Sequence, residues 1–435
     1  MATYLTRTPA STTDAQRKTW TYSVWIKPSN ILSSGNGGEF AWIYQASGGS
    51  SAYVRMDSNY KMRYRDYTNG GSPDYLRITD RLFRDPSAWY HVVLRNDTTQ
   101  STAADRVRLY VNGELQEWQN ATQPAQDHIG FINSTFPIQI GESSSNALRG
   151  SYLSQVIMCA GQSYAPTVFG STDANGIWVP NSQPSITYGT NGFKLDFIGT
   201  GASADASGFG ADSSGNNNHF ASTGLGTNPS TSDNPYNNFA VYNAVDTSSN
   251  ITLSKGNTVA TANSNHSASR ASMGLRSGKW YWENKIDSVS GGPAVGVIAA
   301  NAPLANQLNA NPSRFYRNNG EKYSNGSGSS YGDTYTTGDI IGVALDMDNG
   351  ALYFYKNGTI QNSGTAAFTD MLTATTEPWL PAVKLYNEGI SINFGNPSYT
   401  IASGNADANG YGNFEYAVPS GYYALCTKNL AAYGG

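Results

Sequence analysis

The clearest pattern in the chain is an alternation of apolar and polar positions over short segments. In the stretch 20–27, WTYSVWIK, one face carries Trp20, Tyr22, Val24 and Ile26, and the positions between them are mixed. This period of two is typical of a half-buried β-strand. Further strands are predicted at 52–56, 61–64, 90–96, 106–111, 137–141 and 153–160. Short strands bounded by Gly, Asn, Asp or Pro at this spacing predict a β-sandwich.

A second block of strand patterns runs from roughly 250 to 401. Its strands are predicted at 278–286, 294–299, 340–346, 351–356 and 390–394. No segment of useful length repeats its apolar residues with the helical period, so we set parallel α/β folds aside. The fold class is therefore predicted to be all-β, with two antiparallel jelly-roll-type sandwiches joined by an irregular connector rich in Gly, Asn and Ser.

Each block contains the strongest short-range hairpin signal, an Asn-Gly pair between two strand patterns. The pairs are Asn112-Gly113 and Asn357-Gly358, and both residue types tolerate the positive φ that a two-residue turn needs. The residues expected in the two cores are Trp25, Val93, Leu109 and Val111 in the first block, and Trp280, Trp282, Val343, Leu345 and Phe354 in the second.

The pattern weakens between about 170 and 250, and 199–226 is dense in Gly, Ala, Ser and Asn. Fixing such a backbone costs about 1 to 2 kcal/mol per residue, with few apolar side chains to offset it. The apolar anchors on either side are Trp178, Phe193, Leu195, Phe197, Phe220, Phe239 and Tyr242. We predict that they fasten the connector to sandwich surfaces or to an adjacent copy, that it packs between the two domains, and that it joins a subunit contact of obligate size.

Length and composition agree with two sandwich domains and argue against two classes of function, nucleic-acid binding and membrane insertion. A chain of 435 residues suits two or three domains, and only 13% of its residues are charged. The formal net charge is −4 with no basic run, which argues against nucleic-acid binding. No apolar stretch approaches the ~20 residues of a membrane helix, and the start of the chain does not read as a signal peptide. Membrane insertion is not expected.

The residues that could carry chemistry are scattered. Paired carboxylates are the group to test for glycoside hydrolysis, but the candidate glutamates occupy unrelated strand or turn contexts, with no tight acidic motif. They are Glu39, Glu114, Glu117, Glu142 and Glu283. The four histidines, His91, His128, His219 and His266, are isolated from any nucleophile motif. Cys159 and Cys426 lie in apolar segments and are expected to be buried reduced thiols. We predict that the chain is not an enzyme.

One candidate binding site lies in the second block. The segment 301–335 is predicted to be a long polar insertion with aromatic and arginine side chains, the residue types that recognition loops use. Its candidate ligand-binding residues are Arg314, Tyr316, Tyr323, Tyr331 and Tyr335. Contact with a neighbouring subunit and local packing under the loop are the alternatives. The segment 421–426, GYYALC, is expected to dock on a sandwich.

Both blocks resemble known domain families. The first resembles the laminin-G-like, or concanavalin-like, jelly roll through YSVWIKP at 22–28, WYHVVL at 89–94, VRLYVNGELQ at 107–116, IQIGES at 138–143 and YLSQVIMCAGQ at 152–162. The second resembles the SPRY family through GKWYWE at 278–283, AVGV at 294–297, GDIIGVALDMDNGALYFYKNG at 338–358, WLPAV at 379–383 and ISINFG at 390–395. The predicted domains are 1–170, a docked connector 171–250, 251–401, and a C-terminal extension 402–435.

The resemblance to the first family makes calcium a candidate ligand, because relatives often bind it through Asp and backbone carbonyls on one rim. The rim candidates are Asp57, Asp66, Asp97 and Asp105. The alternative is that these residues form turns by accepting hydrogen bonds from their own backbone. In the SPRY family, loops at one edge of the sandwich bind ligands, which agrees with the aromatic insertion.

The connector is similar to a sequence shared by virion proteins of marine and cyanobacterial phages. The matching phrases are YAPTVFG at 164–170, IWVP at 177–180, YGTNGFKLDF at 188–197, DSSGNNNHF at 212–220 and DNPYNNFAVYN at 233–243. This resemblance implies a bacteriophage virion protein, in a tail fibre, an appendage or a capsid-associated position, made in the host cytoplasm. Its expected partners are copies of itself, as in a trimer, other virion proteins and a host-surface glycan. A lectin-like glycan-binding module and a polysaccharide depolymerase are the other functions considered.

Overall fold

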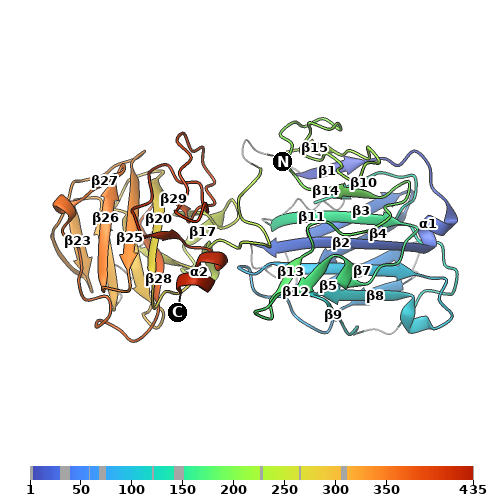
Figure 1. Ribbon diagram of the computed structural model, residues 1–435, viewed down its shortest axis with the longest axis horizontal. Coiled ribbons are helices and arrows are strands. Elements are labelled where there is room, and N and C mark those ends of the chain that lie inside the picture. The colour runs from blue at the N-terminus through green and yellow to red at the C-terminus, as the bar shows by residue number, and fades with distance from the viewer. Residues whose placement is uncertain are drawn as a thin grey trace. The chain divides into compact units, whose positions relative to one another are not determined.

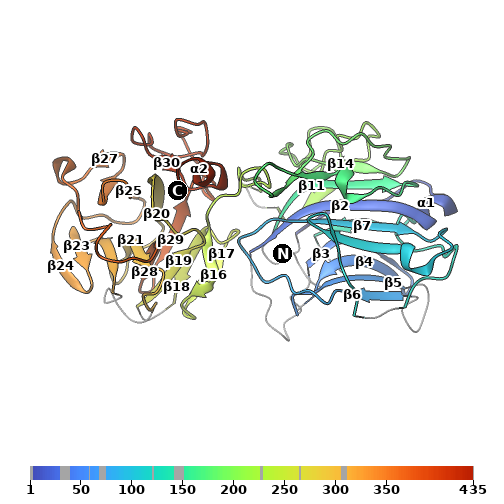
Figure 2. The same cartoon turned by 60° about the horizontal axis from the view of Figure 1, so that its bottom comes forward.

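The structure is a computed structural model that describes residues 3–29, 40–57, 59–67, 75–119, 122–141, 151–225, 229–263, 266–304 and 311–434. The chain divides into two compact units, residues 1–230 and 231–435. Each unit is a sandwich of antiparallel sheets, which confirms the predicted all-β fold class. Figures 1 and 2 show the layers of each unit. None of the described helices has the length and apolar character needed to cross a membrane.

One layer of the first unit is a seven-stranded sheet. Its strands are β1 (Tyr4–Arg7), β3 (Phe40–Ser47), β4 (Ser50–Met56), β5 (Met62–Tyr67), β6 (Tyr75–Ile78), β10 (Ile138–Ile140) and β15 (Ala221–Thr223). Their order across the sheet is β15-β1-β10-β3-β4-β5-β6. In Figure 2, β3 to β6 lie together in this layer.

The other layer is a six-stranded sheet. Its strands are β2 (Thr19–Pro28), β7 (Tyr90–Asp97), β8 (Val107–Val111), β9 (Glu114–Leu115), β11 (Ser151–Ala160) and β14 (Phe193–Leu195), in the order β14-β11-β2-β7-β8-β9. A short helix, α1 (Asp14–Lys18), precedes β2. The hairpin between β8 and β9 turns at Asn112 and Gly113, whose φ values of 51° and 82° confirm the predicted turn.

The core of the first unit lies between the two sheets. The alternating residues of β2, Trp20, Tyr22, Val24 and Ile26, all belong to it, as do Leu109 and Val111. The other two predicted core residues are buried elsewhere: Val93 belongs to a second cluster with Ile157, Cys159 and Phe169, and Trp25 stacks on His91. Both lie on the opposite face of the six-stranded sheet, because they alternate with the core residues of their strands.

The predicted connector is not a separate piece. Its first part forms the hairpin of β12 (Gly170–Thr172) and β13 (Trp178–Pro180). Two further short strands, β14 and β15, add one strand to the edge of each sheet, β14 on β11 and β15 on β1. Residues 171–230 therefore belong to the first unit and the remainder of the predicted connector to the second. Strands of three residues are too short to show a period in the sequence.

The Gly-rich segment after β14 is held by the first unit itself. Phe209 and Phe220 enter its core, and Phe220 packs on Phe193 with ring centroids 4.8 Å apart. The carboxylate of Asp212 accepts hydrogen bonds from the backbone N–H of Lys194 at 2.8 Å and of Asn218 at 2.8 Å. These contacts offset the backbone entropy of residues 199–225. The predicted subunit contact stays a prediction.

The second unit is also a two-layer sandwich. One sheet contains β16 (Tyr242–Thr247), β19 (Ser267–Ala271), β28 (Trp379–Leu385), β21 (Ala294–Ala299), β22 (Ser313–Arg317), β23 (Glu321–Ser324) and β24 (Ser327–Ser330), in that order. The other contains β17 (Ile251–Ser254), β18 (Val259–Ala262), β29 (Gly389–Asn393), β20 (Lys279–Ile286), β25 (Ile340–Asp346), β26 (Ala351–Lys356) and β27 (Thr359–Ile360), in that order. All five predicted core residues of this unit are confirmed.

The C-terminal segment completes the second unit rather than extending from it. Strand β30 (Tyr423–Ala424) pairs in parallel with β20, and helix α2 (Thr427–Tyr433) follows it. Ala424 and Cys426 form a small apolar cluster with Phe239, Tyr281 and Phe414. The predicted docking of 421–426 is confirmed. The hairpin between β26 and β27 turns at Asn357 and Gly358, with φ values of 48° and 79°, as predicted.

Candidate functional site

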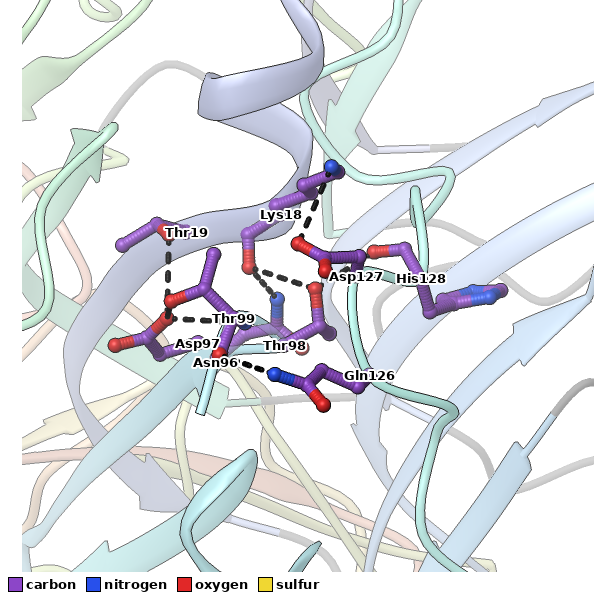
Figure 3. A network of polar contacts seen from close by, with 9 residues as sticks. All are labelled: Lys18, Thr19, Asn96, Asp97, Thr98, Thr99, Gln126, Asp127 and His128. Atoms are coloured by element: carbon purple, nitrogen blue, oxygen red, sulfur yellow. Dashed lines mark hydrogen bonds and ion pairs between the residues drawn. The ribbon is translucent and has the colours of Figure 1, made fainter. Parts of the chain in front are cut away.

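The predicted calcium rim is occupied by the protein's own hydrogen bonds. Asp97 ends β7, and its carboxylate accepts hydrogen bonds from Thr99 Oγ1 at 2.6 Å and from Gln100 Nε2 at 2.6 Å. Thr19 Oγ1 donates to the same carboxylate at 3.3 Å, as Figure 3 shows. Each carboxylate oxygen of Asp97 therefore already has a donor, in the turn that the alternative interpretation describes.

The surroundings of Asp97 join three separate segments of the first unit. Thr98 Oγ1 donates to the carbonyl of His128 at 2.7 Å, and Asn96 Nδ2 donates to the carbonyl of Lys18 at 2.8 Å. The ammonium group of Lys18 lies 3.3 Å from Asp127 Oδ1. In Figure 3 these contacts tie the start of β2 to the end of β7 and to residues 126–128. The network is structural, because its polar atoms bond to one another.

The other three aspartates have separate partners. Asp57 accepts the backbone N–H of Lys61 at 3.1 Å and pairs with Arg63, Asp66 accepts the backbone N–H of Phe131 at 2.9 Å, and Asp105 pairs with Arg108. Among the described residues, no group of three or more His, Cys, Asp or Glu side chains could hold a metal ion. The four candidates are thus not brought together, and the structure assigns no calcium ligands.

A Ser–His pair that the sequence did not reveal lies on the outer side of the six-stranded sheet. Ser23 Oγ is 2.8 Å from Nε2 of His91, and the indole N–H of Trp178 donates to Nδ1 of His91 at 2.9 Å. An indole only donates, so Nδ1 is the acceptor and Nε2 carries the proton. Nε2 therefore donates to Ser23 and cannot take its proton, which excludes this tautomer as a general base for Ser23. Burial lowers the pKa of His91 to about 3.

The predicted recognition loop is mostly strand. Residues 313–330 form β22, β23 and β24, so the prediction of a long loop is wrong for this part, and residues 305–310 lie outside the described chain. Tyr316, Tyr331 and Tyr335 are buried in the core of the second unit. Tyr335 donates to the carbonyls of Pro293 and Tyr316 at 2.9 Å each.

Arg314 is also buried, and Tyr323 is the one predicted ligand-binding residue that is partly exposed. The guanidinium of Arg314 contacts Asp370 twice, Nε to Oδ1 at 3.0 Å and Nη2 to Oδ2 at 2.5 Å. Tyr323 donates to Glu321 at 2.8 Å. Local packing, the third alternative, describes four of the five side chains. Arg314 and Tyr316 lie in β22, whereas Tyr331 and Tyr335 follow β24 outside any strand, and the Gly- and Asn-rich context gave no sign of their burial.

Two of the glutamates considered for hydrolysis, Glu114 and Glu283, have separate partners in the described part of the chain. Glu114 lies 3.3 Å from Arg81 in an exposed ion pair, and Glu39 and Glu142 lie outside the described residues. Glu283 is fully buried, and its two carboxylate oxygens accept the backbone N–H groups of Glu415 at 2.9 Å and Tyr416 at 2.8 Å. Burial raises the pKa of Glu283, and these hydrogen bonds oppose that shift. Glu283 holds the C-terminal segment against β20.

A different surface has the composition of a binding site: the outer face of the seven-stranded sheet. In β5, Met62 and Tyr64 enter the core, so Arg63, Arg65 and Tyr67 point outward. The register places the outward residues of β3 and β4 beside them: Tyr44 opposes Tyr53, Tyr53 opposes Arg65, and Arg55 opposes Arg63. We call this surface the Arg–Tyr face. It consists of Tyr44, Tyr53, Arg55, Arg63, Arg65 and Tyr67.

Two arginines of the Arg–Tyr face, Arg55 and Arg65, are held against its tyrosines, and the third, Arg63, pairs with Asp57. Arg55 Cζ lies 4.0 Å from the ring centroid of Tyr53, and Arg65 Cζ lies 5.9 Å from Tyr53 and 4.6 Å from Tyr67. Tyr53 is 4% exposed, whereas the arginines are half-buried. These cation–π contacts fix the guanidinium groups while leaving parts of them exposed to solvent. The face can offer charge-assisted hydrogen bonds to an anion.

Comparison with known proteins identifies both sandwiches. The model of the concanavalin A-like lectin/glucanases superfamily matches residues 3–155, and the SPRY domain model matches residues 279–397. The chain contains a concanavalin A-like domain followed by a SPRY domain. Both resemblances seen in the sequence are thereby confirmed. The Arg–Tyr face belongs to the concanavalin A-like domain, and Glu283 and Arg314 belong to the SPRY domain.

Relatives in other proteins share part of the chain. It is 34% identical over 138 residues to the ATP-dependent RNA helicase Ddx1 of Drosophila melanogaster, covering 31% of this chain and 18% of that protein. It is 32% identical over 132 residues to Ran-binding protein 10 of Danio rerio, covering 28% and 20%. The chain thus spans about a fifth of each of these relatives. The crystal structure of the SPRY domain of human HERC1 is 22% identical, with a TM-score of 0.31, over 37% of this chain and 99% of that one.

Proposed function

We propose that this chain is a structural and attachment protein of a bacteriophage particle, and that it binds a host surface rather than converting a substrate. The observation that carries the proposal is the Arg–Tyr face, a sheet surface whose guanidinium groups are fixed against tyrosine rings. Arginine and tyrosine contribute contact area and directional hydrogen bonds at modest entropic cost, which makes them common in binding surfaces.

The likeness of the connector to virion proteins of marine and cyanobacterial phages supports the particle assignment. The contacts of Asp212 with Lys194 and Asn218 support it further, since they tie this Gly-rich segment to the first sandwich in a rigid module. In this proposal the partners are copies of the chain itself, as in a trimer, other virion proteins and a host-surface glycan. The protein resides in the virion, as a tail fibre, an appendage or a capsid-associated component.

A host-glycan-binding, lectin-like module is the second candidate, and the Arg–Tyr face favours it equally. The two candidates differ in whether the protein is part of the particle. A polysaccharide depolymerase is the third. No arrangement of carboxylates in the described residues favours it, because Glu283 is saturated by backbone donors and Glu114 pairs with Arg81.

Locating the chain on purified particles tests the proposal. Antibodies against the concanavalin A-like domain should label intact virions at a regular position, and reconstruction of the particle should give a defined copy number. The same antibodies should reduce adsorption of the virions to host cells. Virions that carry no label and lack the chain by mass spectrometry would overturn the particle assignment and leave the lectin-like module as the function.

A further inference from the structure

We propose that Tyr423 and Tyr433 form a site of oxidative cross-linking, at which a one-electron oxidant joins the two phenol rings into dityrosine. The bond ties helix α2 to the SPRY domain. Tyr423 belongs to β30, which pairs in parallel with β20, and Tyr433 is the last residue of α2. Figure 2 shows β30 and α2 beside each other at this end of the chain. This site does not depend on the function proposed above.

The two rings are stacked face to face. Their centroids lie 3.9 Å apart, and their planes are inclined by 8°. A hydrogen bond between the two hydroxyl groups raises the pKa of Tyr423 and lowers the pKa of Tyr433, so both hydroxyl groups lie on the same side of the stack. The ring carbons next to the hydroxyl-bearing carbons are those at which phenoxyl radicals couple. In this arrangement they lie close to van der Waals contact, about 3.5 to 4.0 Å.

The other tyrosine pairs in ring contact within the described residues have a different geometry. Their centroids are 5.3 to 6.3 Å apart, and their planes are inclined by 56° to 87°. Each of them contains at least one fully buried ring, whereas Tyr423 and Tyr433 are half-buried. An oxidant in solution can therefore reach both rings of the stacked pair. The other pairs are Tyr64–Tyr75, Tyr281–Tyr355, Tyr316–Tyr331 and Tyr316–Tyr335.

The coupling is a net loss of two hydrogen atoms. Each phenol gives one electron to the oxidant and one proton to solvent, which leaves a phenoxyl radical. The two radicals form one carbon–carbon bond, and the hydrogen atoms on the bonded carbons then move to the oxygens, so both phenols are restored. The two electrons and two protons reduce one molecule of hydrogen peroxide to water when a haem peroxidase is the oxidant. A photoexcited metal complex takes the electrons singly.

The surroundings of Tyr433 favour its oxidation. Its hydroxyl oxygen accepts a hydrogen bond from Asn409 Nδ2 at 3.3 Å, besides the one from Tyr423. Both hydrogen bonds lower the pKa of Tyr433, because they stabilise the phenolate. A phenolate gives up an electron more readily than a phenol does. Asn409 Nδ2 also donates to Asn429 Oδ1 at 2.8 Å, which keeps this donor in place.

A bond at this position fastens the less restrained end of α2. The start of the helix is held by the backbone N–H of Thr427, which donates to the carbonyl of Asn238 at 2.9 Å. At the other end, the ring of Tyr433 supplies the stacking contact with Tyr423. A helix of seven residues is marginal without tertiary contacts, and helix ends fray. Closing the short loop from 423 to 433 opposes this fraying.

Brief illumination of the full chain with ruthenium tris-bipyridyl and persulfate tests the site, because this photo-oxidant couples tyrosines that already touch. Trypsin cuts after Lys384 and Lys428, so the two tyrosines fall in separate peptides, 385–428 and 429–435, and Tyr433 is the single tyrosine of the second. We expect a monomer that has lost two hydrogen atoms, shows dityrosine fluorescence and yields the two peptides joined. Joined peptides in dimers only, or none at all, would overturn the inference.

Two variants assign the bond. Tyr423→Phe keeps the stacked ring but lacks the phenol, and it should abolish the joined peptide. Tyr422→Phe is the matched control and should leave the yield unchanged, because Tyr422 packs on the apolar cluster of Phe239 and not with Tyr433. Equal losses in the two variants, or none in Tyr423→Phe, would refute the assignment. Both should melt like the original chain, and Tyr433→Phe repeats the test if Tyr423→Phe melts early.

Hydrogen exchange measures the consequence for the helix. The backbone N–H of Gly434 donates to the carbonyl of Leu430 at 2.8 Å and reports on the last turn. After oxidation it should exchange about tenfold more slowly or better, because the cross-link restricts opening of this turn. Tyr422→Phe should show the same slowing and Tyr423→Phe none. Unchanged exchange in the cross-linked chain would mean that the bond does not fasten α2, and this part of the proposal would fall.

Discussion

Replacing His91 with Phe should change how the stability of the concanavalin A-like domain depends on pH. His91 is fully buried, and burial lowers its pKa to about 3 from an ordinary value of 6.5. Its ring stacks on Trp25 with centroids 4.6 Å apart, and both ring nitrogens are hydrogen-bonded, to Ser23 and Trp178. A Phe ring can keep the stacking, but it neither titrates nor forms these hydrogen bonds.

The magnitude follows from the difference in pKa between the two states. Between about pH 6.5 and pH 3 the unfolded chain binds a proton at His91 that the folded chain does not bind. Stability must therefore fall as the pH falls through this range, by about 1.4 kcal/mol for each pH unit. At pH 7 the variant should be less stable than the original by about 1 to 3 kcal/mol, because the hydrogen bonds of Ser23 and Trp178 are lost. Acidification to pH 4.5, two units below the ordinary pKa of 6.5, should destabilise the original protein by about 2.7 kcal/mol relative to the variant, which cancels or reverses this difference.

Urea unfolding of both proteins between pH 7.5 and pH 4.5 measures the effect, and the difference between them cancels the titration of all other groups. NMR of the His91 ring gives a second readout: its proton shifts should stay constant down to about pH 4. A constant difference in unfolding free energy across this range, or titration of the ring near pH 6.5, would refute the argument.

Three other predictions concern the turns and the SPRY domain. Glu283→Ala leaves the backbone N–H groups of residues 415 and 416 without an acceptor, which should cost about 1 to 3 kcal/mol of stability for each group. Hydrogen exchange at these two amides should become faster, and unchanged exchange would contradict the prediction. Gly113→Val and Gly358→Val should each lower stability by about 1 to 3 kcal/mol in thermal melts, because both positions have positive φ. A Cβ atom would also lie 2.6 Å from the ring of Trp178 at position 113 and from the ring of Tyr416 at position 358. Unaltered melting would count against the hairpins. Arg314→Met removes both contacts with Asp370. Because solvent can reach the Asp370 carboxylate, the free energy of unfolding in urea should fall by about 1 to 3 kcal/mol, and a fall below about 0.5 kcal/mol would contradict the prediction.

The strands that face a core on one side were predictable, because their period of two is a direct consequence of one-sided burial. Trp20, Tyr22, Val24 and Ile26 show this pattern and all lie in the first core. The two Asn-Gly turns were predictable for a similar reason, since few residues adopt positive φ. Local sequence alone determines both features.

Features that depend on distant residues were not predictable. Strands β14 and β15 have three residues each and are strands only because β11 and β1 pair with them. Aromatic side chains in 313–335 were expected on a surface, but the Gly- and Ser-rich context hid the strand that buries Tyr316. For the Arg–Tyr face a signal was present in β5, MRYRDY, where arginines alternate with core residues. The sequence of β5 alone does not show that these arginines form a shared surface, because this depends on the pairing with β4, which places Arg55 opposite Arg63.

The hydrogen bond from Trp178 to His91 sets a limit on where the first domain can be cut. The family match ends at residue 155, yet Trp178, β14 and β15 all come later in the chain. A fragment that stops at residue 155 would remove Trp178 from His91 and would leave β1 and the first half of β2 as open edges, which invite aggregation. The smallest fragment that can be expected to fold by itself therefore runs to about residue 230. Homologous chains should be divided by this criterion rather than by the ends of the family match.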